Sequence, residues 1–327
     1  MFMLLAIVVF TFLSLAVHEL GHLLFGLMTG YSFSSLSLLS FVWFKEGEKI
    51  KFTTRKSFAL GQCLMVPVND ERKFKFVLYN LGGVLINMIS ATVAVIPMAA
   101  LGWKNYISYI LLLFVLVQFL MGLINIVPMR SGGVPNDGMN VFEALRSKEA
   151  KHGLFLALFL NGERIAGKRM RDYDDEIFAV GESADFGNYL VAYTVMCEAE
   201  RLYDMGEYDK SLEQYERINA GKLPAFYSAS VNFSLIYHYV MHKPDFEKAK
   251  KIYADKKTGV FLKVFVKLNI PSVMRVLAAY ECFVNEDKEK SMTYLRQAEK
   301  AMETQANSGG TVMEKEYILD LKRKMEA

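Results

Sequence analysis

The stretch Val17-His18-Glu19-Leu20-Gly21-His22 lies near the end of the first long apolar run of the chain. Two histidines four residues apart on a helix project from the same face, so both imidazoles can reach one metal ion. Glu19 follows the first histidine and is placed to polarise a water molecule on that metal. This H-E-x-x-H spacing is typical of zinc hydrolases. We therefore expect His18 and His22 to bind Zn²⁺ and Glu19 to act as the catalytic base.

The apolar run around this motif predicts a membrane-spanning helix. Residues 2–16 carry no charge, and a helix over 2–28 would extend about 40 Å, longer than the ~30 Å hydrocarbon core of a bilayer. An ionisable side chain near the centre of such a helix costs about 2.5–3.5 kcal/mol, so three polar groups on one face need a functional reason. The alternative is a chance match on a helix packed within a bundle.

Composition divides the chain into an apolar part and a charged part. The chain has 327 residues and is 53% apolar, yet its long uncharged runs all lie before Val127. A net charge of +3 without a basic stripe predicts no nucleic-acid partner. Three cysteines without a C-x-x-C pair indicate free thiols in a reducing compartment. The N-terminal run lacks a basic start and a small-residue cleavage site, which favours a retained span over a signal peptide.

Two further apolar runs, at 76–103 and 106–127, predict a second and a third span. Small residues in the second span allow another helix to approach closely, and its buried asparagines need partners. Between the first two spans the pattern changes to a period of two, which predicts a β-hairpin over 31–54 with Gly47 in the turn. Residues 57–68 are either a further strand or a connecting loop.

Two prolines and three glycines interrupt the helical pattern between Asn125 and Gly138. Non-helical backbone at membrane depth persists only where it lines a polar cavity or is buried in protein. Asp137 can cap a helix that starts at Gly138 and can also offer a carboxylate to a metal. Taken alone it would be an ordinary N-cap, but beside His18 and His22 it is the expected third ligand.

Loop charges predict the orientation of the chain in the bilayer. The link between the first two spans is rich in Lys and Arg from Lys45 to Lys75, whereas the link between the second and third carries only Lys104. Positive charge marks the cytoplasmic side. The sequence thus predicts a multi-pass protein of the cell membrane, with its N-terminus outside and everything after Asp137 in the cytoplasm.

After a charged helical connection at 146–185, residues 186–327 show a recurring pair of helices. The segment 206–215 recurs loosely at 244–253 and more weakly at 286–295, each time after a longer helix. The pattern resembles tetratricopeptide repeats, although its spacing of about 40 residues exceeds the usual length of about 34. The resemblance implies an all-α cytoplasmic repeat domain in which about three repeats bury a core.

His238 and His242 repeat the four-residue spacing of the first motif. No Glu follows His238, and no third ligand is evident in the sequence around the pair. We interpret both histidines as structural residues of the repeat domain.

The first 145 residues resemble the site-2 protease family of intramembrane zinc metalloproteases. The resemblance implies a three-span core with Asp137 as third zinc ligand, substrate-binding roles for Asn125 and Asn87, and a β-hairpin that pairs with the substrate. The chain departs from the family in the longer separation of Asn125 and Asp137, so residues 130–133 are interpreted as an insertion. Besides the H-E-x-x-H motif, the residues that carry the resemblance are Gly83 to Asn87, Asn125-x-x-Pro128 and Asp137-Gly138.

The favoured function is zinc-dependent cleavage of a membrane-embedded peptide bond near the cytoplasmic face, in regulated intramembrane proteolysis or signal-peptide processing. Zn²⁺ held by His18, His22 and Asp137 leaves a position for water, whose proton Glu19 can take. Expected partners are the lipid bilayer, a single-span protein or signal peptide as substrate, and a peptide or protein held by the repeats. The alternative is an inactive core that anchors a helical-repeat scaffold. A zinc-dependent transporter or sensor would not need Glu19 in the base position.

Overall fold

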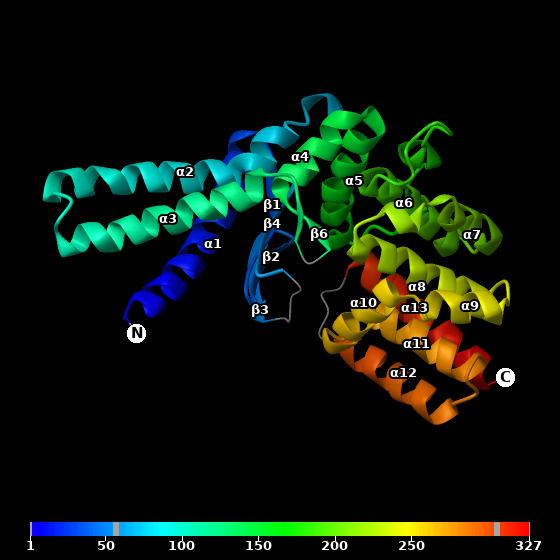
Figure 1. The fold of residues 1–327 in the computed structure, drawn as a ribbon. Helices are drawn as coiled ribbons and strands as arrows, with labels where there is room; N and C mark the ends of the chain where they lie inside the picture. The colour runs from blue at the N-terminus through cyan, green and yellow to red at the C-terminus, as the bar shows by residue number, and fades with distance from the viewer. Residues whose placement is uncertain (1, 55–58, 132, 304–307, 327) are drawn as a thin grey trace. The chain divides into compact units, whose positions relative to one another are not determined.

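The structure, a computed structural model, describes residues 2–54, 59–131, 133–303 and 308–326. Over these residues the chain forms thirteen α-helices, one four-stranded antiparallel sheet and one two-stranded sheet (Figure 1). The expected mostly helical chain with a β region in its first half is therefore confirmed. The backbone contacts separate two compact units, Met1–Arg146 and Ser147–Ala327.

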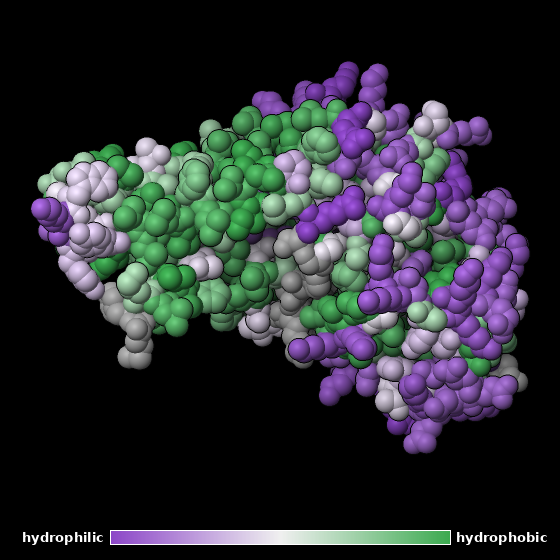
Figure 2. All heavy atoms as spheres, in the orientation of Figure 1, coloured by the Kyte–Doolittle hydropathy of each residue, from purple (hydrophilic) through white to green (hydrophobic). Residues whose placement is uncertain are grey.

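Three helices of the first unit are long and apolar enough to cross a membrane: α1 (Phe2–Met28), α2 (Phe76–Leu101) and α3 (Tyr106–Ile126). Their outer faces carry apolar side chains, as Figure 2 shows for α2 and α3. A continuous apolar surface of this kind is unfavourable in water and marks an interaction with lipid or with another protein. The three helices coincide with the predicted spans, and their composition indicates membrane association.

A short turn places α2 and α3 side by side and antiparallel (Figure 1). Gly102 ends α2 with a φ of 84°, a left-handed conformation that glycine adopts at no steric cost. Asn105 then begins α3, because its side chain accepts a hydrogen bond from the N–H of Ile107 at 2.9 Å. The hydroxyl of Ser108 donates to the carbonyl of Gly102 at 2.8 Å and closes the turn. Helix α1 packs against both of these helices.

The β region is a four-stranded sheet in the order β3-β2-β1-β4. The prediction of one hairpin over 31–54 is incomplete, because a second turn lies at Leu39, where φ is 56°. The sequence hides this turn, since no Gly, Pro, Asn or Asp lies between Leu38 and Phe41. The expected turn at Gly47 is present. The strands are β1 (Ser32–Leu38), β2 (Phe41–Glu46), β3 (Lys49–Thr54) and β4 (Gly61–Val66).

Strand β4 settles the choice between a strand and a loop at 57–68, although residues 57 and 58 lie outside the described part of the chain. It pairs with β1 rather than with its neighbour in sequence, and so occupies one edge of the sheet. Both β1 and β4 pack against α1, the helix that carries the H-E-x-x-H motif.

The described residues of the second unit form helices and connecting turns without a strand, and they contain three antiparallel helix pairs, α6 with α7, α8 with α9, and α11 with α12. Helix α5, in the expected connection at 146–185, packs on α6 and so belongs to this unit. An additional helix, α10, separates the second pair from the third. The α-helices of the unit are α5 (Lys148–Ile165), α6 (Tyr189–Asp204), α7 (Tyr208–Arg217), α8 (Ala225–Met241), α9 (Phe246–Tyr253), α10 (Lys256–Lys267), α11 (Pro271–Phe283), α12 (Lys288–Glu303) and α13 (Gly309–Glu326).

Small buried residues recur where the two helices of each pair meet. The hydroxyl of Ser211 donates to the carbonyl of Ala199 at 2.7 Å, and that of Ser291 donates to the carbonyl of Ala278 at 2.6 Å. Ala249 takes the corresponding place in the second pair and is fully buried. A larger side chain there would push the paired helices apart, which gives the small residue in the repeat pattern a physical reason.

Candidate metal centre

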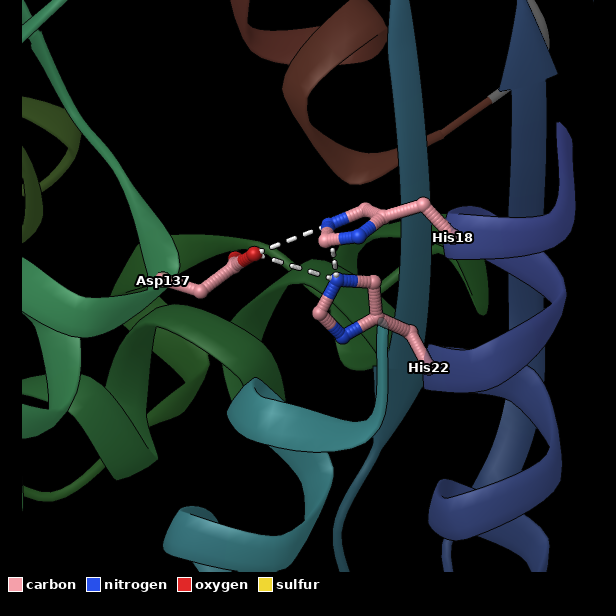
Figure 3. Close-up of side chains that lie close together, drawn as sticks. All are labelled: His18, His22 and Asp137. Carbon is pink, nitrogen blue, oxygen red and sulfur yellow. Dashed lines mark hydrogen bonds and ion pairs between the residues drawn. The ribbon is translucent and has the colours of Figure 1, made fainter. Parts of the chain in front are cut away.

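Three side chains from two elements converge on one point in the first unit (Figure 3). His18 and His22 project from one face of α1, and Asp137 meets them from the start of α4 (Asp137–Arg146). The two Nε2 atoms are 3.2 Å apart. Oδ2 of Asp137 lies 3.0 Å from Nε2 of His18 and 3.4 Å from Nε2 of His22. Within the described residues this is the one group of three such side chains that could hold a metal ion.

The size of this triangle fits a single tetrahedral ion. Zinc binds imidazole nitrogen and carboxylate oxygen at about 2.0–2.2 Å, which places neighbouring ligand atoms about 3.3–3.5 Å apart in a tetrahedron. The three separations observed, 3.0, 3.2 and 3.4 Å, lie close to that value. Two nitrogens and one carboxylate are also a ligand set used by catalytic zinc. The residues present therefore fit the ion that the sequence predicts.

The hydrogen bonds behind the two imidazoles fix which nitrogen faces the site. Nδ1 of His18 lies 2.8 Å from Oδ1 of Asn87, and Nδ1 of His22 lies 2.9 Å from the carbonyl oxygen of Tyr79. Both partners are acceptors, so each Nδ1 must carry the proton and donate it. In the neutral rings this leaves a lone pair on each Nε2, aimed at the common point.

Asn87 is itself oriented by two other helices. Its amide nitrogen donates to the carbonyl and the hydroxyl of Ser14 on α1, at 3.2 and 3.0 Å, and to Oε1 of Gln118 on α3. Ser14 also donates to Oε1 of Gln118 at 3.0 Å. All three side chains are fully buried. Because the amide nitrogen is held by acceptors, the amide oxygen of Asn87 must face His18.

Gly83 allows His18 to lie directly against the backbone of α2. A Cβ atom added at Gly83 would lie 2.5 Å from Cε1 and 2.6 Å from Nδ1 of the His18 ring, closer than van der Waals contact permits. Alanine at this position would therefore push the imidazole away from its partner on α2 or separate the two helices. Gly83 on α2 therefore has a direct role in placing the His18 imidazole.

Asn136 ties the start of α4 to the end of α3. Its amide nitrogen donates to the carbonyls of Ile124 and Val127, at 2.6 and 2.7 Å, which the helix end leaves without partners. Its amide oxygen accepts from the N–H groups of Met129 and Met139, at 3.2 and 2.9 Å. The expectation that Asp137 caps this helix is therefore wrong, because Asn136 is the capping side chain. Asp137 is free to face the histidines.

Gly138 brings the two elements into direct backbone contact. A Cβ atom added there would overlap the carbonyl of Ile126 and would lie 2.9 Å from the carbonyl oxygen of Asn125. Only glycine permits this approach of α4 to the last turn of α3. Asp137 thus lies between Asn136, whose side chain bonds the ends of both helices, and Gly138, which lets α4 contact the last turn of α3.

Glu19 is buried beside the site and faces the sheet. Its Oε1 lies so close to β4 that a Cβ atom added at Gly61 would be 2.5 Å away. Its Oε2 has no hydrogen-bond partner among the described residues. The carboxylate follows His18 directly on α1 and interacts electrostatically with His18, His22 and Asp137. A buried carboxylate oxygen without a partner is available to hold a proton.

The electrostatics of the site keep Asp137 in its ligand form. Burial by itself would raise the pKa of the Asp137 carboxyl, but the facing imidazoles of His22 and His18, when they are protonated, outweigh it and hold the pKa below its ordinary range. The side chain is therefore an anion at neutral pH. An anionic oxygen is the form that binds a divalent cation.

The expected site residues do not all come together. His18, His22 and Asp137 come together, whereas Asn125 donates to the carbonyl of Met121 in its own helix at 3.0 Å. Asn87, expected to bind substrate, has both polar atoms engaged within the chain and stands behind a ligand. Four further residues orient the site, and no motif in the sequence marks them: Tyr79, Gln118, Ser14 and Asn136. Buried polar residues in an apolar span were the available signal for Ser14 and Gln118.

Comparison with known proteins adds no name to this site. No protein family, curated protein or solved structure matches the chain. The interpretation of the site therefore rests on its own geometry and chemistry.

We expect Asn87→Leu to weaken zinc binding about 10–100-fold, the usual effect of removing a partner that orients a ligand. The substitution leaves Nδ1 of His18 without its acceptor. Zinc affinity is measured by competition with a chromophoric chelator on the purified full-length protein. Asn80→Leu is the matched control, because Asn80 is also buried in α2 but donates to the carbonyl of Phe76 in its own helix. Equal affinities for the two variants would contradict this role.

For Asn136→Ala we expect a loss of zinc affinity of roughly tenfold or more, because Asp137 loses the contacts that hold it at the end of α3. Asn136→Asp keeps the acceptor oxygens but removes both donors, and should give an intermediate affinity. Asn105→Ala removes the cap at the other end of α3 and serves as the control. Unchanged zinc binding in Asn136→Ala would show that the loop holds Asp137 without this side chain.

Proposed function

We propose that the chain is a zinc-dependent intramembrane endopeptidase, similar to the site-2 protease family. One observation carries the proposal: two imidazole nitrogens and a carboxylate oxygen converge within 3.4 Å of one another beside a buried glutamate, and the two imidazoles lie on a helix apolar enough to cross a membrane. A chance occurrence of the H-E-x-x-H spacing gives no reason for a third ligand, or for two hydrogen bonds that orient the imidazoles.

The chemistry divides between the ion and the residues around it. Zn²⁺ bound by His18, His22 and Asp137 would polarise a water molecule and the substrate carbonyl. Glu19 takes the proton of the attacking water on its unpartnered Oε2 and delivers it to the leaving amine, so that peptide-bond cleavage consumes one water molecule. Asn87 and Tyr79 keep the two imidazoles in the orientation that this requires.

The edge of the sheet offers a place for an extended substrate. A helical substrate hides its carbonyls, so its backbone must be unwound before hydrolysis and then needs new hydrogen-bond partners. Strand β4 lies at an edge of the sheet and contacts Glu19 at Gly61. Addition of the substrate as a strand to β4 would supply those partners beside the base. This moves the proposed pairing from the expected hairpin over 31–54 to β4.

The proposed setting is the cell membrane, with the three apolar helices as spans. The basic link between α1 and α2 favours a cytoplasmic position for the sheet and for the second unit. A single-span membrane protein or a signal peptide is the corresponding substrate class, and the proposed role of the helix pairs is to hold a peptide or protein in the cytoplasm.

Two rival functions differ from this proposal in what they require. An inactive anchor for a scaffold needs neither the ligands nor Glu19. Two histidines and one carboxylate also form the ligand set of non-haem iron oxygenases, which need open positions on the metal but no adjacent glutamate base. The buried Glu19 beside the ligands favours hydrolysis. Elemental analysis of the purified protein separates zinc from iron.

Replacement of Glu19 by Gln should leave about one zinc ion per chain while lowering peptide hydrolysis by roughly 10²–10⁴-fold, because it removes proton transfer and keeps the ligands. Asp137→Ala should lose both zinc and activity. The assay uses a single-span substrate in proteoliposomes, with zinc counted by elemental analysis. Glu48→Gln, at a freely exposed carboxylate, is the control. Wild-type cleavage by Glu19→Gln would end this mechanism.

The proposed orientation places Glu48 and Lys104, both exposed, on opposite sides of the membrane. In intact cells a membrane-impermeant maleimide should label Lys104→Cys and spare Glu48→Cys until the membrane is opened. The three native cysteines are buried, so the unsubstituted chain gives the background. The opposite labelling pattern would invert the topology, and labelling of both positions would remove α2 as a span.

A further inference from the structure

A cavity of about 520 Å³ lies within the second unit, in the size range of small-molecule sites. Residues of α6, α8, α11 and α13 line most of it, and none of them belongs to the metal centre. Its walls are largely apolar and aromatic. The aromatic lining side chains include Tyr203, Phe226, Phe233, Tyr237, Phe265 and Tyr317.

Two guanidiniums in this cavity have a nitrogen donor without a partner among the described residues, Nε of Arg164 and Nη1 of Arg275. Arg275 on α11 forms two hydrogen bonds with the Glu314 carboxylate on α13, from Nε at 2.6 Å and from Nη2 at 3.2 Å. It lies over the ring of Tyr237 at 4.2 Å and is 8% exposed. Its Nη1 has no hydrogen-bond partner among the described residues. Two N–H donors are therefore left for an acceptor oxygen.

One buried imidazole supplies the complementary group. Ser211 gives its only proton to the carbonyl of Ala199, so it must accept the N–H of Nε2 of His238 at 3.1 Å. Burial, with the charge of Arg275 added to it, lowers the pKa of His238 to about 4, so the ring is neutral at physiological pH. Nδ1 then carries a lone pair, and among the described residues it has no donor. His238 is 1% exposed.

The ionised side chains of the cavity balance one another. Arg275 pairs with Glu314, and the guanidinium of Arg164 pairs with the Glu200 carboxylate. These four are the Arg, Lys, Asp and Glu side chains that line it among the described residues. With no net charge to neutralise, the cavity favours an uncharged ligand, because a buried charge without a counterion is unfavourable.

We propose that this cavity binds an uncharged ligand with an aromatic or branched apolar body and an amide group, whose carbonyl accepts from Nη1 of Arg275 and whose N–H donates to Nδ1 of His238. An amide presents both an acceptor and a donor on one small group. A carboxylate would satisfy Arg275 but would meet the lone pair of His238 with another lone pair and would add an unbalanced charge. This site goes beyond the proposed proteolysis and does not depend on the metal centre.

The test uses the full-length protein in lipid nanodiscs and two small probes with the same body. N-acetyl-L-phenylalaninamide is uncharged, whereas N-acetyl-L-phenylalanine carries a carboxylate. We expect saturation-transfer NMR titration to show binding of the amide, with at least tenfold weaker binding of the acid. A capped Phe-Leu-Phe tripeptide separates the two sources of such an amide. Tighter binding of the tripeptide assigns the cavity to peptide segments, and a preference for the single residue assigns it to small amides.

Variants connect the binding to the cavity. Ser272→Phe, at a lining position on α11, fills space and should abolish binding, whereas Thr293→Phe, at an exposed position on α12, should not. His238→Phe removes the acceptor and should weaken the amide about tenfold, the effect of losing one good hydrogen bond. The double variant Arg275→Met/Glu314→Gln removes the donor while keeping the charges balanced. No binding of either amide probe, equal binding of the acid, or binding unchanged by Ser272→Phe would overturn the proposal.

Discussion

The hydrogen bond between Asn87 and His18 is the constraint on which the first unit depends. It joins His18 on α1 to α2, and the other end of the same amide is held by Ser14 of α1 and by Gln118 of α3, so one side chain connects all three apolar helices. Buried polar groups are unfavourable unless each finds a partner, and in an apolar bundle the alternatives are few. The packing of the three helices and the orientation of the His18 imidazole therefore depend on each other. A shift of any one helix would disturb His18.

Besides this hydrogen-bond network, two close backbone contacts position the residues of the site. Gly83 lets the His18 ring lie on the backbone of α2, and Gly138 lets α4 touch the last turn of α3. Glycine in a helix is unfavourable by about 0.5–1 kcal/mol relative to alanine, so these positions accept a weaker helix in exchange for a closer approach. The contact at Gly83 positions His18, and the contact at Gly138 positions the neighbouring Asp137. The H-E-x-x-H spacing on α1 orients His18 and His22 toward one face. The distance from them to Asp137 is set by the contacts of Asn136 and Gly138 with the end of α3.

The sequence predicted the parts of this unit that depend on side-chain type and spacing. Long uncharged runs predicted the three apolar helices, and the motif with Asp137 predicted the ligand group. It did not predict the turn at Leu39, because no Gly, Pro, Asn or Asp marks that turn, or the cap at Asn136, because asparagine is common in loops without such a role. It could not reveal the acceptor for His22, which is a backbone carbonyl at Tyr79 and carries no signal in the residue type. The helix pairs of the second unit were expected from three similar segments of sequence, whereas the cavity among them depends on which helix faces meet.

Asp137 reaches the histidines despite its longer separation from Asn125 in the sequence. The contacts of Asn136 explain why. The N–H of Asn136 donates to the carbonyl of Met129 at 3.1 Å, and its side-chain oxygen accepts from the N–H of Met129, so these two residues lie side by side. The chain between them leaves and returns at one place, with β5 (Arg130–Ser131) paired to β6 (Val134–Pro135). Extra residues between the two strands lengthen this hairpin but do not move Met129 and Asn136, where it begins and ends. Asp137 therefore takes its position from Asn136 and Gly138, and the number of residues after Asn125 does not determine whether the ligand is in place.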